Sequence, residues 1–317
     1  MSRCFVSRAL PEELLAPLVA EHDVDMWPEE TTPPPHEELV ARCSEAEGLL
    51  SMLSDRIDAG FIAACPRLRA ISNYAVGVDN VDLEAATARG IPVGHTPDVL
   101  TDTTADVAFA LMLAAARRVV ESDALVRAGR WPAWEPFGFL GHDVHHTTLG
   151  IVGFGRIGRA VARRAAGFGM DVLHTRDVSL DELLERSDFV SLHVPLSGST
   201  RGLIGERELL KMKPTAILVN TARGPIVDTA ALERALKQGW IAAAGLDVTD
   251  PEPLPPDHPL LTAPNLTVLP HIGSATRRTR EAMAKLAVEN LLRGLRGERM
   301  PKCANPSVYE SPTRRAP

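Results

Sequence analysis

Short apolar runs alternate with helical patterns along the first hundred residues of the chain. The segments between the runs place apolar residues on one face of a helix, while the runs themselves have the length of buried strands. Strand, helix and strand at this spacing predict a parallel sheet with helices on both faces. The predicted strands are Cys4–Val6, Val24–Met26, Gly48–Met52, Leu68–Ile71 and Ile91–Val93, and the predicted helices are Pro11–Glu21, His36–Arg42, Asp58–Ala64 and Asp82–Arg89.

A break at Thr96-Pro97-Asp98 ends this first series. Beyond it, the apolar pattern predicts a long helix from about Thr104 to Val120. Thr103 and Asp106 stand at the spacing of a capping box, with Asp in the usual place of Glu. The segment from Glu121 to His146 has no clear period.

A second alternating series of strands and helices begins at Thr148. Ser179 and Glu182 form a full capping box before one of its helices, and Gly239 is placed to end another. A last helix is predicted from about Thr276 to Leu295, and the polar, proline-rich tail, residues 301–317, is predicted to be poorly ordered. The predicted strands are Leu149–Gly153, Asp171–His174, Phe189–Val194, Ala216–Asn220, Ala242–Asp247 and Leu266–Leu269.

Length, composition and charge are those of an ordinary globular enzyme. A chain of 317 residues exceeds the usual size of one domain, so we expect two. Hydrophobic residues make up 45% and charged residues 24% of the chain, which is enough for a normal core. The formal net charge of −7 argues against a nucleic acid as the main partner.

The cysteines and the apolar runs predict a cytoplasmic protein. The four cysteines, Cys4, Cys43, Cys65 and Cys303, form no C-x-x-C pair and have no histidine cluster beside them, so we expect free thiols and no metal site. Acidic residues near the start interrupt any secretory signal. The longest apolar run, Val107–Ala116, is too short to span a bilayer, so we expect no membrane partner.

A dinucleotide-binding fingerprint follows the first strand of the second series. It is Gly153-Phe154-Gly155-Arg156-Ile157-Gly158, with a predicted helix from Arg156 to Phe168. Gly153 permits the tight turn, Gly155 lets the backbone approach a pyrophosphate, and Gly158 lets the helix pack on the strand. The pyrophosphate would lie on the free N–H groups at the start of the helix. A glycine-rich turn without a ligand is the weaker interpretation, because strand and helix flank the motif as required.

Three polar side chains follow later strands of the same series: Arg223, Glu252 and His271. Ligands of open α/β sheets bind at the carboxyl ends of the strands, so the three can converge. Reduction of a ketone needs a proton donor at the oxygen, a cation for a carboxylate and a group that orients the donor. Taken singly, each residue has an ordinary structural explanation. Their joint placement after the fingerprint favours a catalytic one.

These motifs resemble the D-isomer-specific 2-hydroxyacid dehydrogenases, and among them most closely the glyoxylate/hydroxypyruvate reductases. The resemblance extends from about Arg3 to Pro301. The segments that carry it, besides the fingerprint, are Tyr74-Ala75-Val76-Gly77-Val78-Asp79, residues 94–105, Thr221-Ala222-Arg223-Gly224, Gly245-Leu246-Asp247-Val248 and residues 270–276.

The resemblance implies a role for each matching residue. His271 would be the acid/base on the substrate oxygen, Glu252 would hold its other ring nitrogen, and Arg223 would bind the substrate carboxylate. Backbone N–H groups of Val76 and Gly77 would cradle that carboxylate. Leu53, Ser54 and Ser274 would line the same cleft. The implied cofactor contacts are Thr104, Arg156, Ile157, Pro195, Thr221, Asp247 and Gly273; for Thr104, helix capping is an equally good explanation.

The resemblance also implies a discontinuous layout of two doubly wound parallel-sheet domains. A flavodoxin-like substrate domain would comprise residues 1–97 and 277–300, and a Rossmann-type cofactor domain would comprise residues 98–276. The chain departs from the family in one place. Only Thr175 to Val178 separate the strand Asp171–His174 from the helix that Ser179 begins, where family members usually have another helix and a short edge strand. The adenosine side of the cofactor pocket is therefore expected to be less enclosed.

The same short segment bears on the choice of coenzyme. An NAD site usually has an acidic residue about 20 residues past the fingerprint, on the ribose 2′-OH. Arg176 stands where that acid is expected, and a guanidinium can pair with a 2′-phosphate. Asp177 can still take the acidic role, and Arg176 can be a solvated charge. On balance we expect NADPH to be preferred over NADH, with weak binding of either.

Two further expectations concern partners. Trp131, Trp134, Phe137 and Phe139 fall within nine residues of the segment that lacks a period. Four such rings in a loop need a cover, and a symmetric homodimer supplies it better than folding back onto the same subunit.

The leading function is a reductase of a small 2-oxo acid. The alternative is a dinucleotide-sensing, corepressor-like binding module of the same fold.

Overall fold

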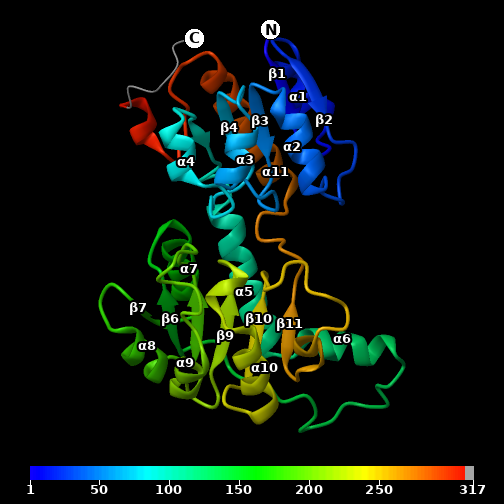
Figure 1. Cartoon of the computed structure of the whole chain (residues 1–317). Coiled ribbons are helices and arrows are strands. Elements are labelled where there is room, and N and C mark those ends of the chain that lie inside the picture. The colour runs from blue at the N-terminus through cyan, green and yellow to red at the C-terminus, as the bar shows by residue number, and fades with distance from the viewer. Residues whose placement is uncertain (311–317) are drawn as a thin grey trace. The chain divides into compact units, whose positions relative to one another are not determined.

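The computed structural model describes residues 1–310 and divides into two compact units (Figure 1). Unit 1 comprises residues 1–100 and the chain from Thr276 onward, and unit 2 comprises residues 101–275. In the described part of the chain, no helix combines the length and the apolar character that a bilayer crossing requires.

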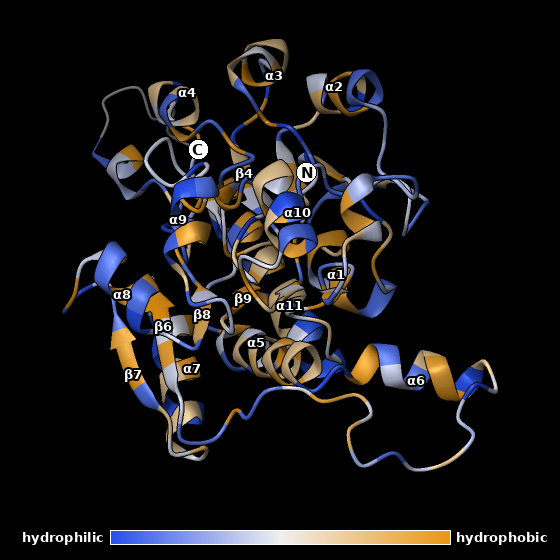
Figure 2. Ribbon diagram, turned by 90° about the horizontal axis from the view of Figure 1, so that it is seen from below, coloured by the Kyte–Doolittle hydropathy of each residue, from blue (hydrophilic) through white to orange (hydrophobic). Residues whose placement is uncertain are grey.

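Unit 1 is built on a parallel sheet of five strands in the order β2-β1-β3-β4-β5. This is the flavodoxin-like order. Helices α2, α3 and α4 form a row on one side of it, and α1 and α11 cover the other (Figure 2). The strands are β1 (Arg3–Val6), β2 (Asp23–Met26), β3 (Gly48–Ser51), β4 (Ala70–Asn73) and β5 (Val93–Gly94). The helices are α1 (Glu12–Val19), α2 (His36–Ser44), α3 (Ala59–Ala64), α4 (Leu83–Ala88) and α11 (Arg277–Leu295).

Unit 2 contains a parallel sheet of six strands in the order β11-β10-β9-β8-β6-β7. Central strands such as β8 and β9 are buried at every residue, as parallel strands between two helical layers must be. The strands are β6 (Thr148–Val152), β7 (Asp171–His174), β8 (Phe189–Leu192), β9 (Ile217–Asn220), β10 (Ala243–Leu246) and β11 (Leu266–Val268). The helices are α5 (Thr101–Ala116), α6 (Val119–Arg127), α7 (Arg156–Ala166), α8 (Leu180–Arg186), α9 (Glu206–Lys211) and α10 (Thr229–Gln238), with 3₁₀ turns η1 (Gly224–Ile226) and η2 (Pro259–Thr262).

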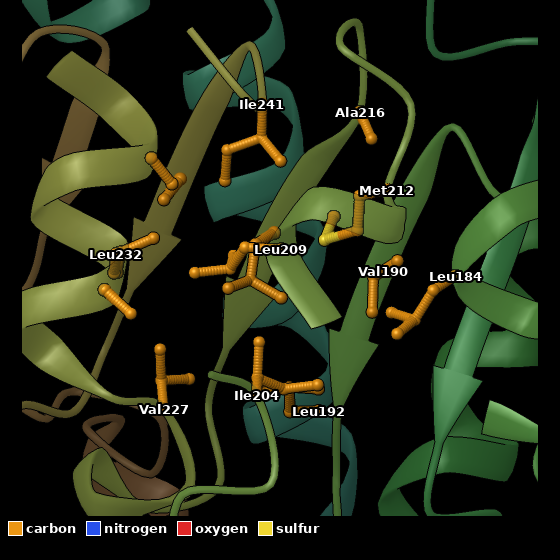
Figure 3. Packing of buried hydrophobic residues seen from close by; sticks show 14 of the residues in the cluster. Leu184, Val190, Leu192, Ile204, Leu209, Met212, Ala216, Val227, Leu232 and Ile241 are labelled. Atoms are coloured by element: carbon orange, nitrogen blue, oxygen red, sulfur yellow. The ribbon is translucent and has the colours of Figure 1, made fainter. Parts of the chain in front are cut away.

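Two apolar cores sandwich the sheet of unit 2. On one side, α5 and α7 pack against each other and against the strands. On the other, residues from β8, α9 and α10, among them Leu192, Leu209 and Leu232, form a second core (Figure 3). Two wholly parallel sheets with helices on both faces confirm the predicted doubly wound α/β class.

In the sheet of unit 2 the strand order changes direction at β6, which pairs with β7 on one side and with β8 on the other. Ligands of open α/β sheets bind at such a switch point. Beyond β7, the described residues add no further strand to the sheet. Only residues 175–179 connect β7 to α8, and they form no helix or strand, as the sequence predicts.

The capping signals of the sequence are partly confirmed. The Ser179 hydroxyl accepts from the Glu182 N–H at 3.2 Å, and Gly239 ends α10 with a φ of 70°. The capping box predicted at Thr103 and Asp106 is wrong. Helix α5 begins at Thr101, so both residues lie inside it, and Asp106 pairs with Arg164 of α7.

The end predicted for the long helix, Thr104 to Val120, is also wrong. Helix α5 ends at Ala116, and Arg118 turns the chain with a φ of 53° before α6 begins. The carbonyl of Ala116 accepts from the His142 N–H, which brings the returning chain against the helix end. Apolar periodicity continues through this bend, so the sequence alone does not show it.

The expectation of a poorly ordered tail is wrong for residues 301–310. A 3₁₀ turn, Pro306–Tyr309, follows α11, and Asn305 binds the start of β5. The Asn305 side chain accepts from the Val93 N–H at 2.8 Å and donates to the Ile91 carbonyl at 3.0 Å. A single buried amide therefore fixes a segment whose composition is that of a loop. The rest of the predicted tail, residues 311–317, lies outside the described residues.

This contact predicts a stability effect. Asn305→Ala leaves the buried N–H of Val93 and the carbonyl of Ile91 without their partner, and such groups cost about 1–3 kcal/mol each. We expect the free energy of unfolding to fall by about 2–4 kcal/mol in urea denaturation. Ser307→Ala, at an exposed position of the same turn, is the control and should change it by less than about 0.5 kcal/mol. Equal stabilities of the two variants would contradict the role given to Asn305.

Candidate active site

The fingerprint glycines lie at the switch point of unit 2, and each has a different steric environment. Gly153 has a φ of 97°, and a Cβ there would lie 2.6 Å from the His193 carbonyl carbon. A Cβ on Gly158 would lie 2.3 Å from the Gly153 oxygen, so α7 approaches β6 only because the side chain is missing. A Cβ on Gly155 would meet nothing within 4 Å. The protein itself therefore does not require glycine at Gly155, and the open space fits a ligand phosphate.

The start of α7 provides the matching donors. Gly155 is its N-cap and supplies no side-chain acceptor to the first N–H groups of the helix. Arg156 is exposed at the first helical position, while Ile157 packs into the core below. Uncapped N–H groups, a helix dipole and an adjacent cation form a binding site for a pyrophosphate. The residues present thus fit a dinucleotide.

The other predicted contacts on this side follow the neighbouring strands. Arg176 is exposed after β7, and Pro195 is exposed after β8. Thr175, between β7 and Arg176, accepts from the Gly153 N–H at 3.1 Å, which ties the end of β7 to the glycine turn. The sequence had assigned no role to Thr175.

His271 and Glu252 form the predicted pair. The His271 Nδ1 atom lies 2.6 Å from Glu252 Oε1, and the two side chains are 25% and 33% exposed. Burial works against ionisation of Glu252, but the contact with His271, the Thr249 N–H and the charge of Arg223 outweigh it and lower the pKa of the carboxyl. An ionised carboxylate on Nδ1 leaves Nε2 as the ring atom that can exchange a proton with a ligand.

Asp247 fixes the loop that presents His271. His271 has a φ of 56°, a left-handed conformation that costs a residue with a side chain about 1–3 kcal/mol. The carboxylate of Asp247 accepts from the N–H groups of Ile272 at 2.7 Å and Gly273 at 2.8 Å, which holds the strained turn. Burial raises the pKa of Asp247, and these two donors and the nearby His271 act in the opposite direction.

Three predicted cofactor contacts meet at this turn. A Cβ on Gly273 would lie 2.9 Å from Asp247 Oδ2 and 3.5 Å from the Thr104 side chain. Thr104 is buried in the first turn of α5, so it is not the residue that caps the helix. Ser274, predicted to bind substrate, follows Gly273 and is half-buried.

Arg223 belongs to the turn after β9. Its guanidinium donates to the Ala222 carbonyl at 2.8 Å, and the Asn220 amide binds the Arg223 carbonyl at 2.8 Å. A Cβ on Gly224 would lie 1.9 Å from the Thr249 oxygen, so the Arg223 and Glu252 loops are in direct contact. Gly224 is in a motif that the sequence singled out, and Asn220 ends the predicted strand before it, but their positioning roles become visible only in the structure.

Thr221 supplies an independent sign of a missing ligand. Its hydroxyl oxygen is buried and has no hydrogen-bond partner among the described residues. Buried polar groups are nearly always paired, by protein, water or ligand. The unpaired hydroxyl, in the same turn as Arg223, fits a polar group of a bound ligand.

The predicted carboxylate cradle lies in unit 1, on the loops that follow β3 and β4. Leu53 is 36% exposed, and Val76 and Gly77 are half-buried. The Val76 carbonyl contacts His95 Nδ1 at 2.9 Å, and the Gly77 carbonyl accepts from Asn73 at 3.1 Å. Both carbonyls are occupied by side chains of unit 1.

A buried amide network that the sequence analysis missed joins these two loops. Asn80 donates to the carbonyls of Met52 at 3.1 Å and Asp55 at 3.0 Å, and Asn73 donates to Asn80 at 3.0 Å. The same Asn73 binds the Gly77 carbonyl, so one network spans both loops. The two residues lie beside the recognised Tyr74–Asp79 motif, and that adjacency is the only signal the sequence offers.

A second cluster supports the Leu53 loop from β1. Asp55 is buried and accepts from the Ser7 hydroxyl and from the Met52 N–H at 2.8 Å. Arg8 donates to the Ser54 hydroxyl at 2.8 Å and lies 3.9 Å from Asp55. Burial raises the pKa of the Asp55 carboxyl, against the effect of these donors.

Comparison with known proteins decides the family. The model of the NAD-binding domain of D-isomer-specific 2-hydroxyacid dehydrogenases matches residues 109–273. The chain belongs to this family. Its members are NAD(P)-dependent oxidoreductases, which agrees with the fingerprint and with the His271–Glu252 pair.

Individual relatives extend the match over nearly the whole chain. A glyoxylate reductase of Korarchaeum cryptofilum is 51% identical over 323 residues, which cover 97% of each chain. The crystal structure of the TT0316 protein of Thermus thermophilus has a TM-score of 0.89 and 50% identity, covering 95% of this chain and 99% of that one. An NADPH-dependent glyoxylate/hydroxypyruvate reductase of Sinorhizobium meliloti, solved with NADP and malonate, has a TM-score of 0.84 and 32% identity, with 96% of each chain covered.

The open space at Gly155 predicts a separation of binding from stability. Gly155→Ala adds a methyl group that meets no protein atom, so the midpoint of thermal unfolding should change by no more than a few degrees. The same methyl group occupies the place of the pyrophosphate, so the Kd for NADPH should rise at least about tenfold. Gly158→Ala, which collides with the Gly153 oxygen, should lose both stability and binding. Unchanged NADPH affinity in Gly155→Ala would show that the dinucleotide does not lie there.

Proposed function

We propose that this chain reduces glyoxylate and hydroxypyruvate to glycolate and D-glycerate, with a reduced nicotinamide dinucleotide as hydride donor. The observation that carries the proposal is the His271–Glu252 contact of 2.6 Å beside the Arg223 loop, in the unit that bears the fingerprint. Relatives about half identical over nearly full length are named glyoxylate reductases, which supports the choice of substrate.

The roles of the side chains follow from their chemistry. The bound nicotinamide supplies the hydride that C2 of the 2-oxo acid receives. His271 donates a proton from Nε2 to the carbonyl oxygen, and Glu252 stabilises the protonated ring through Nδ1. Arg223 binds the carboxylate and polarises the carbonyl. In the reverse direction His271 takes the proton from the hydroxyl group.

Substrate contacts are proposed for both units. In unit 1, the N–H groups of Val76 and Gly77 bind the carboxylate, and Leu53 provides an apolar surface. In unit 2, Ser274 contacts the substrate from the loop after His271. The amide network of Asn73 and Asn80 supports these assignments, because it gives the two loops of unit 1 a fixed relative position.

We propose a preference for NADPH over NADH. Arg176 is exposed after β7, at the place where an acidic residue would bind the ribose 2′-OH. The missing helix and edge strand leave the adenosine side less enclosed, so we expect either coenzyme to bind weakly. The remaining cofactor contacts are proposed from Thr104, Arg156, Ile157, Pro195, Thr221, Asp247 and Gly273.

A corepressor-like binding module is the less favoured function. A module of this kind could keep the fold and even Arg223, Glu252 and His271, so these three residues alone do not exclude it. The high identity to reductases over nearly the full chain favours an enzyme. Turnover of glyoxylate, followed by the absorbance of the coenzyme, separates the two functions.

We also propose a homodimer and a cytoplasmic location. Trp131, Trp134 and Phe137 are 61%, 79% and 82% exposed, and α6 buries none of its residues. Helix α6 projects from the rest of unit 2, so its apolar side chains are available to a second copy (Figure 2). Light scattering at micromolar concentration should give the mass of a dimer, and a monomer would refute the assembly. The four cysteines are free thiols, three of them buried, which agrees with a reducing compartment.

The catalytic assignment predicts the effect of removing the imidazole. His271→Ala should lower kcat for glyoxylate and hydroxypyruvate by about 10²–10⁴-fold, because the proton donor is lost. The Kd for NADPH should stay within about twofold, since the pyrophosphate site is untouched. Arg223→Ala should in addition raise KM for the 2-oxo acid. Near-normal kcat in His271→Ala would contradict the mechanism.

The coenzyme assignment predicts a change in preference. Arg176→Ala removes the cation proposed for the 2′-phosphate, so kcat/KM with NADPH should fall about tenfold or more. The value with NADH, which lacks that phosphate, should change by less than about twofold. Arg201→Ala, an exposed arginine of the loop after β8, is a matched control. A strong NADH preference that Arg176→Ala leaves unchanged would refute the assignment.

A further inference from the structure

The end of β7 carries a ring stack that the proposed chemistry does not use. Phe154, from the fingerprint, and His174, the last residue of β7, lie with ring centroids 3.7 Å apart and planes at 28°. Phe154 also packs against the core between α5 and α7. The imidazole is thereby held in one orientation by a residue of the dinucleotide-binding turn itself.

The fixed imidazole contacts an acidic neighbour. His174 Nε2 lies 3.1 Å from Asp177 Oδ2, and the two side chains are 16% and 71% exposed. The backbone supports the contact, because the N–H groups of Asp177 at 3.0 Å and Val178 at 3.2 Å both donate to the His174 carbonyl. Asp177 is therefore turned back toward the strand from which it comes.

In the part of the chain that the structure describes, the other ring nitrogen of His174 has no partner that competes with the contact to Asp177. This atom, Nδ1, is buried and has no hydrogen-bond partner among the described residues. Nε2 is therefore the ring atom through which His174 contacts a polar neighbour, and that neighbour is Asp177.

Asp177 is the residue that would oppose NADPH. It stands about 20 residues past the fingerprint, next to Arg176, where an acid binds the ribose 2′-OH of NAD. A carboxylate free at this place would bind the 2′-OH of NADH and repel the 2′-phosphate of NADPH. A carboxylate that already contacts an imidazole binds the 2′-OH more weakly and repels the 2′-phosphate less.

We propose that His174 is a positioning residue for coenzyme selection: held by the stack on Phe154, it engages Asp177 and withdraws the carboxylate from the ribose, so that Arg176 faces the 2′-phosphate. This rests on the proposed NADPH preference and adds the reason for it. The shortened segment makes the arrangement possible, because Asp177 follows the strand with only Thr175 and Arg176 between it and His174.

The test compares Kd and kcat/KM for NADPH and NADH in four variants and the wild type. His174→Phe keeps a ring on Phe154 but removes the nitrogen that contacts Asp177. We expect the ratio of NADPH to NADH preference to fall about tenfold, since the freed carboxylate binds the 2′-OH. In the double variant His174→Phe with Asp177→Asn, the ratio should return to within about threefold of the wild type. An unchanged ratio in His174→Phe, or a loss that persists in the double variant, would overturn the proposal.

Asp177→Ala tests the same idea at an exposed position where folding is not at risk. If His174 already withholds the carboxylate, the ratio should change by less than about threefold. A rise of tenfold or more, caused by loss of NADH binding, would show that Asp177 binds the ribose in the wild type and would overturn the proposal. Arg176→Ala distinguishes a failure of the NADPH assignment from a failure of the role proposed for His174. If it leaves the ratio unchanged, the NADPH assignment fails; if it lowers the ratio while His174→Phe does not, only the role of His174 fails.

Discussion

The buried carboxylate of Asp247 is the constraint on which the rest of the active site depends. It accepts both N–H groups that follow His271, and so holds that residue at a positive φ. A buried carboxylate is costly unless it is hydrogen-bonded, and these two donors offset part of that cost. Without them the imidazole would have no fixed direction toward Glu252. The pair proposed for catalysis is thus positioned by a residue to which we assign no part in proton transfer.

Parallel sheets explain why residues so far apart in sequence act together. The turns after β6, β9 and β10 all leave the sheet of unit 2 at the same edge, and they carry the fingerprint, Arg223 and Asp247. Close contacts then lock the turns to one another. Gly224 touches the Thr249 backbone and Gly273 touches Asp247, and in both places a side chain would push the loops apart. The close packing of these turns therefore depends on glycines as well as on the charged residues.

Much of this was predictable from the sequence, and the failures have physical causes. Short apolar runs placed every strand within a few residues, because buried parallel strands are continuous apolar runs. The glycine spacing and the strand-end positions of Arg223, Glu252 and His271 identified the candidate site. The bend at Arg118 was missed because the apolar pattern runs through it. The order of residues 301–310 was missed because it depends on one long-range amide, Asn305.

The amide network of Asn73 and Asn80, the Asp247 clamp and the His174–Asp177 contact were beyond sequence reasoning for a related cause. Asn and Asp are ordinary loop residues, and their role is decided by partners that only the fold brings near. The shortened segment after β7 was visible in the sequence. Its consequence, an acid turned back by an imidazole, needed the position of the Phe154 ring.

The central claim is that the ionised carboxylate of Glu252 orients His271 for transfer of a proton to the substrate. The most direct test is the pH dependence of kcat/KM for glyoxylate in Glu252→Gln and in the wild type, with NADPH saturating. The amide keeps a hydrogen bond to Nδ1 but removes the charge, so kcat/KM should fall at neutral pH. In the wild type, kcat/KM should also fall toward the value of the variant as the pH falls through the lowered pKa of Glu252, where the charge is lost. A variant profile as high as that of the wild type at neutral pH would contradict the account.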